Sequence, residues 1–188
     1  MPRSNQTKRL LAQSLMDLMT TTPLEKISVN DIVDHAGVGR NTFYYHFEDK
    51  YDLVNWYFQS GVTQFLVERS AYASWNALLE AVEDYLLENK VFYCNALAYT
   101  GQNSLQQYIF DYLSSIFMQR GIGADENLLA GRFFAGALMG ILQPWVLGGM
   151  KTNTTRPSQA VPLLSVDELE VILRGELGET HEPGKLPQ

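Results

Sequence analysis

Residues 27–50 read ISVNDIVDHAGVGRNTFYYHFEDK, and this stretch decides the fold. Its first half carries both a start signal and a stop signal for a helix. Ser28 is a good N-cap residue, and Asp31 can reach back to it as in a capping box. Gly37 permits the left-handed conformation that ends many helices. We therefore expect a short helix from Val29 to His35.

The second half of the stretch predicts another helix, from about Arg40 to Phe47, after the acceptable but weak cap Gly39. Phe43 and Phe47 stand four residues apart, so they would be buried on one face. At about 100° per residue, the polar and phenolic side chains around them point toward the other faces. Two short helices joined at a glycine form a helix-turn-helix, whose second helix reads the major groove of DNA.

The side chains expected to face DNA can all hydrogen-bond to base edges or to phosphates. An amide, a hydroxyl with a methyl group and two phenols suit the groove, whereas cations and a histidine at its rim suit the backbone. The histidine and the tyrosines could instead be ordinary surface or core residues, but two phenylalanines already fill the buried face. The predicted DNA-binding residues are Ser28, Arg40, Asn41, Thr42, Tyr44, Tyr45, His46 and Lys50.

The run Thr42-Phe43-Tyr44-Tyr45-His46-Phe47, followed by Asp49, Lys50 and Leu53, resembles the TetR family of dimeric transcriptional regulators. From Pro23 to Trp56 the chain looks most like the DhaS-like branch of that family, the regulators of dihydroxyacetone kinase. Beyond Trp56 the likeness is a helical pattern of the right length. The resemblance implies an all-α fold of about nine helices, with an N-terminal three-helix helix-turn-helix domain and a C-terminal helical bundle.

Length and cysteine usage are compatible with such a regulator. A chain of 188 residues can form one large or two small domains. A single cysteine, Cys94, excludes an internal disulfide, and no Cys/His cluster has metal-ligand spacing, so we expect a reducing compartment, no metal and no cofactor. The N-terminus has no signal-peptide pattern. We therefore expect a cytoplasmic protein.

The formal net charge of −7 is the main objection to DNA binding. Residues 1–55 hold six Lys and Arg against seven Asp and Glu, whereas the remainder holds eight against fourteen. The acidic excess is therefore concentrated away from the predicted helix-turn-helix. We expect modest non-specific affinity and a shallower salt dependence than a strongly basic DNA binder shows.

Helical periodicity continues through the rest of the chain, without a convincing alternating strand pattern. We expect a DNA-binding domain over residues 1–52, an effector-binding and dimerisation domain over 53–175, and a mobile polar tail over 176–188. Besides the helix-turn-helix, the expected helices are Thr7 to Thr20, a long helix from Asp49, Trp75 to Asn89, Lys90 to Tyr99, Ser104 to Arg120, Asp125 to Leu147 and Val166 to Arg174.

The most apolar stretch, residues 133–147, is shorter than the ~20 residues that a membrane span needs. It contains Gln143 and follows Arg132, so we interpret it as a buried helix with small residues at a close contact. With the helix around Val166 it could form a four-helix interface in a two-fold dimer, where the family resemblance also places it. The predicted interface residues are Gly131, Ala135, Leu138, Ile141, Leu142, Trp145, Leu169, Ile172 and Leu173.

Aromatic side chains are frequent in the middle helices. Most would fill the core of an all-α domain, whereas some could line an apolar effector cavity, as the family's second domain often does. The near-absence of Lys and Arg among them argues against an anionic ligand, and the family branch leaves a protein effector equally open. The predicted pocket residues are Trp75, Tyr85, Phe92, Tyr93, Tyr99, Phe110, Phe117 and Phe134.

These features predict a dimeric, sequence-specific DNA-binding regulator that is controlled by a small apolar ligand or a protein partner. Its two recognition helices would enter successive major grooves of a palindromic operator, about 34–36 Å apart. The alternative is a small helical ligand-binding protein or an enzyme that uses the aromatic cavity. Because the sequence has no catalytic triad, paired carboxylates or metal-ligand spacing, we expect no enzymatic activity.

Overall fold

The computed structural model describes residues 2–67, 72, 74–118, 124–151 and 155–160, and within these ranges the chain forms helices and no strands. The predicted all-α fold is thereby confirmed. The elements are α1 (Pro2–Met19), the 3-10 helix η1 (Leu24–Lys26), α2 (Val29–Ala36), α3 (Arg40–His46), α4 (Lys50–Val67), α5 (Trp75–Glu88), α6 (Lys90–Ala98), α7 (Leu105–Met118), α8 (Ala124–Leu147) and α9 (Pro157–Ala160).

The predicted helices correspond to observed ones, with small differences at their ends. The first helix begins at Pro2 rather than near Thr7. The helix expected at Val166 to Arg174 and the expected tail lie outside the described residues. The expected boundary after residue 52 falls inside α4, which runs without interruption from one part of the molecule into the other. The division into two domains therefore stays a prediction.

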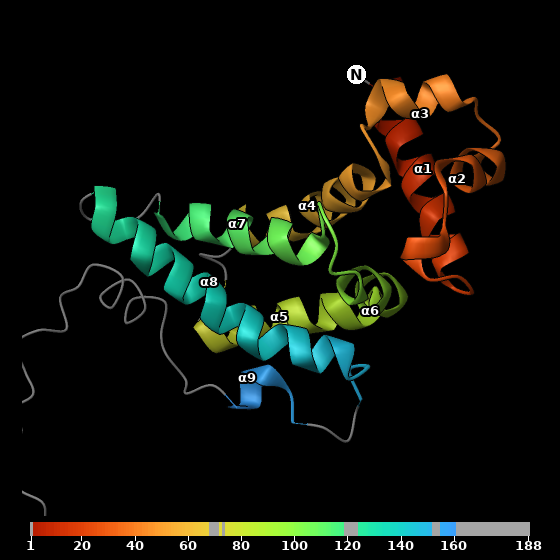
Figure 1. Cartoon of the computed structure of the whole chain (residues 1–188). Helices are drawn as coiled ribbons and strands as arrows, with labels where there is room; N and C mark the ends of the chain where they lie inside the picture. The colour runs from red at the N-terminus through yellow and green to blue at the C-terminus, as the bar shows by residue number, and fades with distance from the viewer. Residues whose placement is uncertain (1, 68–71, 73, 119–123, 152–154, 161–188) are drawn as a thin grey trace, which may run out of the picture.

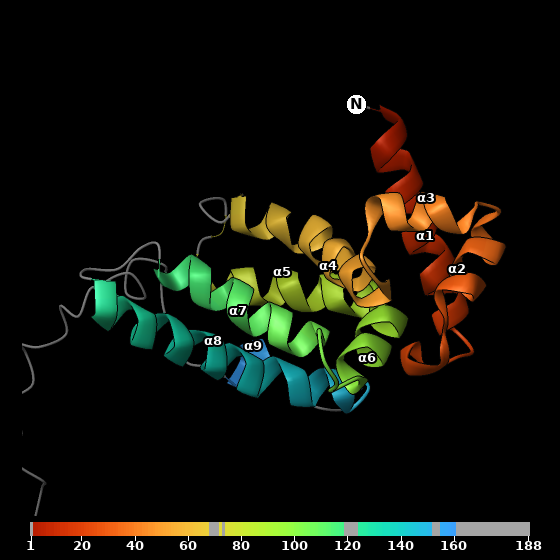
Figure 2. The ribbon, with the colours of Figure 1, turned by 45° about the horizontal axis from the view of Figure 1, so that its top comes forward.

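The first three helices gather at one end of the molecule, which we call the head (Figures 1 and 2). Leu11 of α1, Ile32 of α2 and Phe43 of α3 are fully buried there, so each helix contributes an apolar side chain to a shared core. Leu15 of α1 is also buried in this core. Burial of this kind, rather than intrinsic propensity, stabilises helices as short as α2 and α3.

From the head, α4 leads into a bundle in which α7 packs along α8, and α6 lies across the end nearest to α1 (Figures 1 and 2). Helix α8 ends in a Schellman motif, because Gly149 has a positive φ of 82° and the amide of Met150 donates to the carbonyl of Trp145. Among the described residues, no helix is both long and apolar enough to cross a membrane.

Helix α8 buries within the subunit much of the face that the sequence predicted for dimer contacts. Gly131, Ala135 and Trp145 are buried within the subunit, so little of their surface is open to a second chain, and their place in a dimer contact stays a prediction. These residues face the neighbouring helices because α8 packs on α7 and α6. The side chains of Leu138, Ile141 and Leu142 are half-buried. The other predicted contacts, Leu169, Ile172 and Leu173, lie outside the described residues.

Candidate DNA-binding surface and effector cavity

The helix-turn-helix is built by the caps that its sequence encodes. The Oγ of Ser28 accepts from the amide of Asp31 at 3.2 Å, and the Asp31 carboxylate accepts from the Ser28 amide at 2.8 Å. The Ser28 hydroxyl also donates to this carboxylate at 2.7 Å, and the bonds from the hydroxyl and the amide of Ser28 lower the pKa of Asp31. At the other end of α2, Gly37 has a φ of 67°, which a glycine adopts without steric cost. The predicted capping box and left-handed turn are both present.

Helix α3 turns its phenylalanines inward and its polar groups outward. Phe43 and Phe47 are 0% and 2% exposed. On the outer side, Asn41 is exposed, while Tyr44 and Tyr45 are 47% and 82% exposed. A tyrosine with four-fifths of its surface in solvent is unusual for a side chain that packing alone would place. The arrangement is the one expected of a recognition helix.

Arg40, predicted as a phosphate contact, also orders its own helix. Its guanidinium donates to Oδ1 of Asn30 on α2 at 3.0 Å and to the hydroxyl of Tyr44 at 3.2 Å, and its carbon lies 5.4 Å from the Tyr44 ring centre. Asn30 was not predicted as part of this surface, because ten residues separate it from Arg40 and no helical spacing links them. Arg40 thus contacts both the Tyr44 side chain and α2.

The remaining predicted contacts differ in exposure. Thr42 and His46 are half-buried, and the imidazole of His46 lies edge-on to Tyr45 with ring centres 4.9 Å apart. Beside them, the ammonium of Lys8 on α1 lies 5.1 Å from the ring centre of Phe47. This cation was counted in the charge balance but not assigned to the surface. It places a positive charge next to α3.

Lys50 has a different role from the predicted one. Its ammonium donates to the carbonyl oxygens of Leu24 at 2.8 Å, Glu25 at 3.0 Å and Ile27 at 2.6 Å. An ammonium has three N–H groups, so this set uses all of them and leaves none for a phosphate. Burial lowers the pKa of Lys50. We therefore correct the prediction: Lys50 holds the loop around η1 instead of reaching DNA directly.

The predicted pocket aromatics mostly pack against one another. Phe92 and Tyr93 on α6 are buried, and the ring centre of Tyr85 lies 5.9 Å from that of Tyr93. Tyr99 stacks on Tyr51 at the start of α4, with ring centres 4.5 Å apart. The described contacts of these side chains are those of a core and of a helix junction. Phe134 contacts Phe133 edge-on, and the side chains of Trp75 and Phe117 lie outside the described set.

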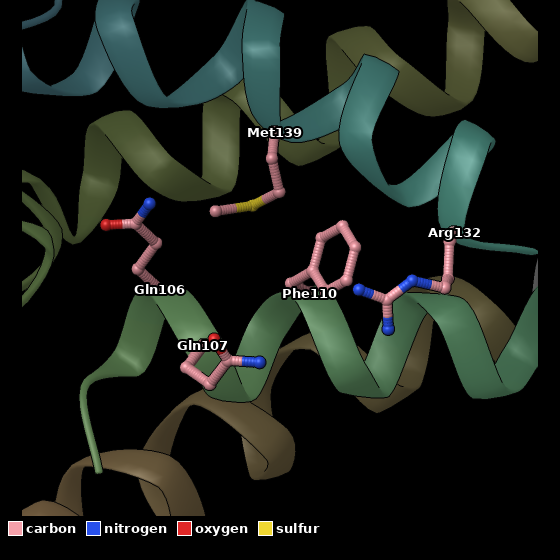
Figure 3. A pocket seen from close by; sticks show the side chains of 5 residues that line it. All are labelled: Gln106, Gln107, Phe110, Arg132 and Met139. Atoms are coloured by element: carbon pink, nitrogen blue, oxygen red, sulfur yellow. The ribbon is translucent and has the colours of Figure 1, made fainter. Parts of the chain in front are cut away.

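A cavity of about 250 Å³ lies between α7 and α8, and Phe110 is the member of the predicted set that lines it (Figure 3). Figure 3 shows Met139 and Arg132 on α8 facing Gln106, Gln107 and Phe110 on α7. The guanidinium carbon of Arg132 lies 5.0 Å from the Phe110 ring centre. An anionic ligand was not expected because Lys and Arg are scarce among the middle aromatics, but Arg132 supplies a cation to this cavity.

Metal-ligand clusters and the single cysteine can be checked in the described part of the chain. No three His, Cys, Asp or Glu side chains there lie together as they would around a metal ion. Cys94 donates its thiol to the carbonyl of Val146 at 3.2 Å, and burial raises its pKa. A thiol with a raised pKa is a poor nucleophile because little thiolate is present.

Two family models match the chain. The one described as bacterial regulatory proteins, tetR family, matches residues 14–60, which include the helix-turn-helix. The one described as transcriptional regulator C-terminal region, TetR_C_8, matches residues 73–159. Together they cover both parts of the molecule.

Curated relatives agree with these models. The chain is 33% identical over 93 residues to the HTH-type dhaKLM operon transcriptional activator DhaS of Lactococcus lactis subsp. lactis (strain IL1403), covering 50% of each chain. It is 32% identical over 108 residues to the HTH-type transcriptional regulator SAB2452 of Staphylococcus aureus (strain bovine RF122 / ET3-1), covering 50% of this chain and 58% of the relative. The chain thus spans about half the length of the curated relatives it matches. These relatives are transcriptional regulators, which are not enzymes.

Solved structures share the fold. The dihydroxyacetone kinase operon activator DhaS superposes with a TM-score of 0.55 at 23% identity, over 82% of this chain and 88% of that one. NalD, the secondary repressor of the MexAB-OprM multidrug efflux pump in Pseudomonas aeruginosa, gives a TM-score of 0.53 at 16% identity, over 92% and 94%. At these identities the likeness establishes the architecture alone.

Proposed function

Because this chain belongs to the TetR family of transcriptional regulators, we propose that it is a homodimeric, sequence-specific DNA-binding regulator rather than an enzyme. In each subunit α3 enters a major groove, and the two subunits read the two halves of a palindromic operator. The protein binds DNA in the cytoplasm, where bacterial DNA lies. An effector controls it by favouring one of two spacings of the heads.

The observation that carries the proposal is the outer face of α3. Asn41 offers an amide that can bond an adenine edge in two places, and Tyr45 offers a ring and a hydroxyl. Both side chains are exposed, while Phe43 beneath them is fully buried. The helix is therefore held rigidly by its buried side and presents hydrogen-bonding groups on the other. This is the chemistry that direct base readout requires.

A stripe on α8 supports the dimer. Leu129 and Phe133 are 72% and 70% exposed, and Leu147 is 47% exposed. Gly136 and Gly140 stand between them on the same face and are also exposed. Glycines allow a partner helix to approach closely, and large exposed apolar side chains in a row are typical of protein contacts. We place the two-fold contact on this stripe instead of on the face predicted from sequence.

Two kinds of effector fit the described residues. A small molecule could occupy the cavity beside Arg132, whose cation would suit a carboxylate or another anionic group. A protein could instead contact the surface of the bundle. The cavity favours the small molecule, because it combines an apolar wall of Phe110 and Met139 with polar groups at its edge.

A gel-shift assay with the DNA upstream of the protein's own gene tests the proposal. We expect a specific complex, which Asn41→Ala or Tyr45→Ala weakens by about 1–3 kcal/mol. Glu88→Ala is a matched control, because this exposed residue at the end of α5 lies far from α3 and should leave the affinity unchanged. Unchanged binding by both folded α3 variants would show that the reading surface lies elsewhere.

A further inference from the structure

Helix α6 belongs to the bundle but touches the head. Figures 1 and 2 both show it beside the end of α1 that leads into η1. On its bundle side, Phe92, Tyr93 and Ala96 are at most 1% exposed, and Cys94 bonds to the last turn of α8 through Val146. The helix is therefore fixed within the bundle, and any side chain that it extends to the head ties the two parts together.

Asn95 is such a side chain. Its Oδ1 accepts from the amide of Leu24 at 2.7 Å. Its Nδ2 donates to the carbonyl oxygens of Met19 and Thr22, both at 3.1 Å. One amide group thus binds three backbone groups in the connection between α1 and η1, at sequence separations of 71 to 76 residues.

All three partners of Asn95 are main-chain atoms, so these hydrogen bonds resist rearrangement. A side chain that loses a partner can rotate to find another, but a backbone group can do so only if the loop itself moves. Leu24 is 1% exposed, so its amide would have no water to replace Asn95. The same loop is held from the opposite side by Lys50, at the start of α4.

Helix α4 is the covalent connection between head and bundle, and a single helix leaves the head free to swing about it. Two weaker contacts limit that motion near the start of α4: the stack of Tyr99 on Tyr51 and the bond from Asn103 to Asp49 at 3.3 Å. Both partners of the latter bond are side chains that can adjust. Asn95, by contrast, binds the backbone of the head from a helix other than α4.

We propose that Asn95 is a positioning residue that sets the angle between the head and the bundle, and thereby the spacing of half-sites that the dimer accepts. This inference rests on the proposed function, because spacing has meaning only when two heads bind one operator. The exposed stripe of α8 joins the subunits, α6 is bonded to the end of α8, and Asn95 carries that geometry to the head. Without it, each head would reorient and accept half-sites at other distances.

The test compares one operator with a second that has two base pairs inserted between its half-sites. The insertion turns one half-site by about 70° relative to the other, so a rigid dimer should lose at least about tenfold in affinity. For Asn95→Leu, which keeps the size but removes all three bonds, we expect the ratio of the two affinities to fall to about threefold or less. Both DNAs are measured on one preparation, so any inactive fraction cancels from the ratio.

Val91→Ala is the matched control, since Val91 lies on α6, is 49% exposed and takes no part in the hydrogen bonds that join α6 to the head or to α8. It should keep the wild-type ratio. If Asn95→Leu does not fold, Asn95→Asp replaces it: its carboxylate can still accept from Leu24 but repels the two carbonyls, and the ratio should fall likewise. Hydrogen exchange adds a readout independent of DNA, because the Leu24 amide loses its acceptor in Asn95→Leu and should exchange faster in that variant.

A wild-type ratio in the folded Asn95 variants would overturn the inference, and so would a Val91→Ala ratio as low as theirs. Failure of the wild-type protein to bind any operator would instead overturn the proposed function. The two failures are therefore distinguishable. A low ratio in the Asn95 variants but not in the control, together with faster exchange of the Leu24 amide in Asn95→Leu, supports the assignment of Asn95 as a positioning residue.

Discussion

The ammonium nitrogen of Lys50 lies 2.6 Å from the carbonyl oxygen of Ile27, so the first residue of α4 holds the end of the loop that precedes α2. Two further carbonyls, of Leu24 and Glu25, complete its set of acceptors. A residue that follows the recognition helix in sequence thus fixes the position of the helix that precedes it. The helix-turn-helix is closed by this contact as well as by its apolar core.

Replacement of Lys50 by methionine should therefore reduce stability rather than phosphate contact. We expect Lys50→Met to lower the free energy of unfolding by about 1–3 kcal/mol, because three carbonyls lose a charged donor. The slope of log K against log salt concentration for DNA binding should stay unchanged. Replacement of a lysine that contacts a phosphate would instead reduce the magnitude of that slope by about one per subunit. Lys26→Met, which removes the same charge from an exposed position, is the control for stability.

Acidification should weaken the cap of α2. Hydrogen bonds from the hydroxyl and amide of Ser28 lower the pKa of Asp31 below its ordinary value. Such a carboxylate stabilises the fold above its unfolded-state pKa, and the contribution is lost as the pH falls through the folded-state pKa. We expect the stability difference between wild type and Asp31→Ala to be constant near neutral pH and to shrink below about pH 4.

Urea unfolding at a series of pH values measures that difference. Asp34→Ala is the control, because this exposed carboxylate lies in the same helix but outside the capping box. A stability difference for Asp31→Ala that stayed constant down to pH 2 would show that the cap does not depend on the charge of the carboxylate.

Local features of the head could be predicted because their causes lie within a few residues. Ser28 and Asp31 are three positions apart, and the left-handed turn at Gly37 needs only the residue itself. The inward faces of Phe43 and Phe47 follow from a four-residue spacing. In each case the physical signal is complete in one segment of sequence, so one segment was enough to predict it.

Contacts between distant segments could not be predicted in this way. Lys50 finds its carbonyls 23 to 26 residues away, and no periodicity marks either partner. The two faces of α8 are similarly apolar, so sequence could not tell that Ala135 packs inward while Phe133 stays exposed. Arg132 was noted only as the charge that begins an apolar run, although it lines the cavity with Phe110.

The exposed stripe of α8 leads to a prediction about assembly. Phe133 is 70% exposed in the subunit, so a charge there costs little in the monomer but would be desolvated in a dimer contact. We expect Phe133→Asp to shift the protein from dimer to monomer in sedimentation at micromolar concentration. Val91→Asp is the control, because Val91 is 49% exposed on α6, away from the stripe. A Phe133→Asp protein that remained dimeric would place the contact elsewhere.

Glu83 gives the last prediction, because it is a fully buried acid that docks α9 onto α5. Its carboxylate accepts from the amide of Ser158 at 2.6 Å and from its hydroxyl at 2.8 Å. Glu83→Ala leaves the amide and hydroxyl of Ser158 without an acceptor and creates a void. It should therefore lower the free energy of unfolding by about 2–4 kcal/mol. Glu83→Gln can keep both bonds in neutral form and should cost distinctly less.

The neighbouring acid supplies the contrast. Asp84 pairs with Arg156 at 2.8 Å, but its side chain is 63% exposed, so Asp84→Ala should cost at most about 1 kcal/mol. Urea unfolding followed by circular dichroism measures all three variants. Equal losses for Glu83→Ala and Asp84→Ala would mean that α9 is not anchored by the buried carboxylate. A larger loss for Glu83→Ala, largely restored by glutamine, would identify hydrogen bonding to Ser158 as the anchor.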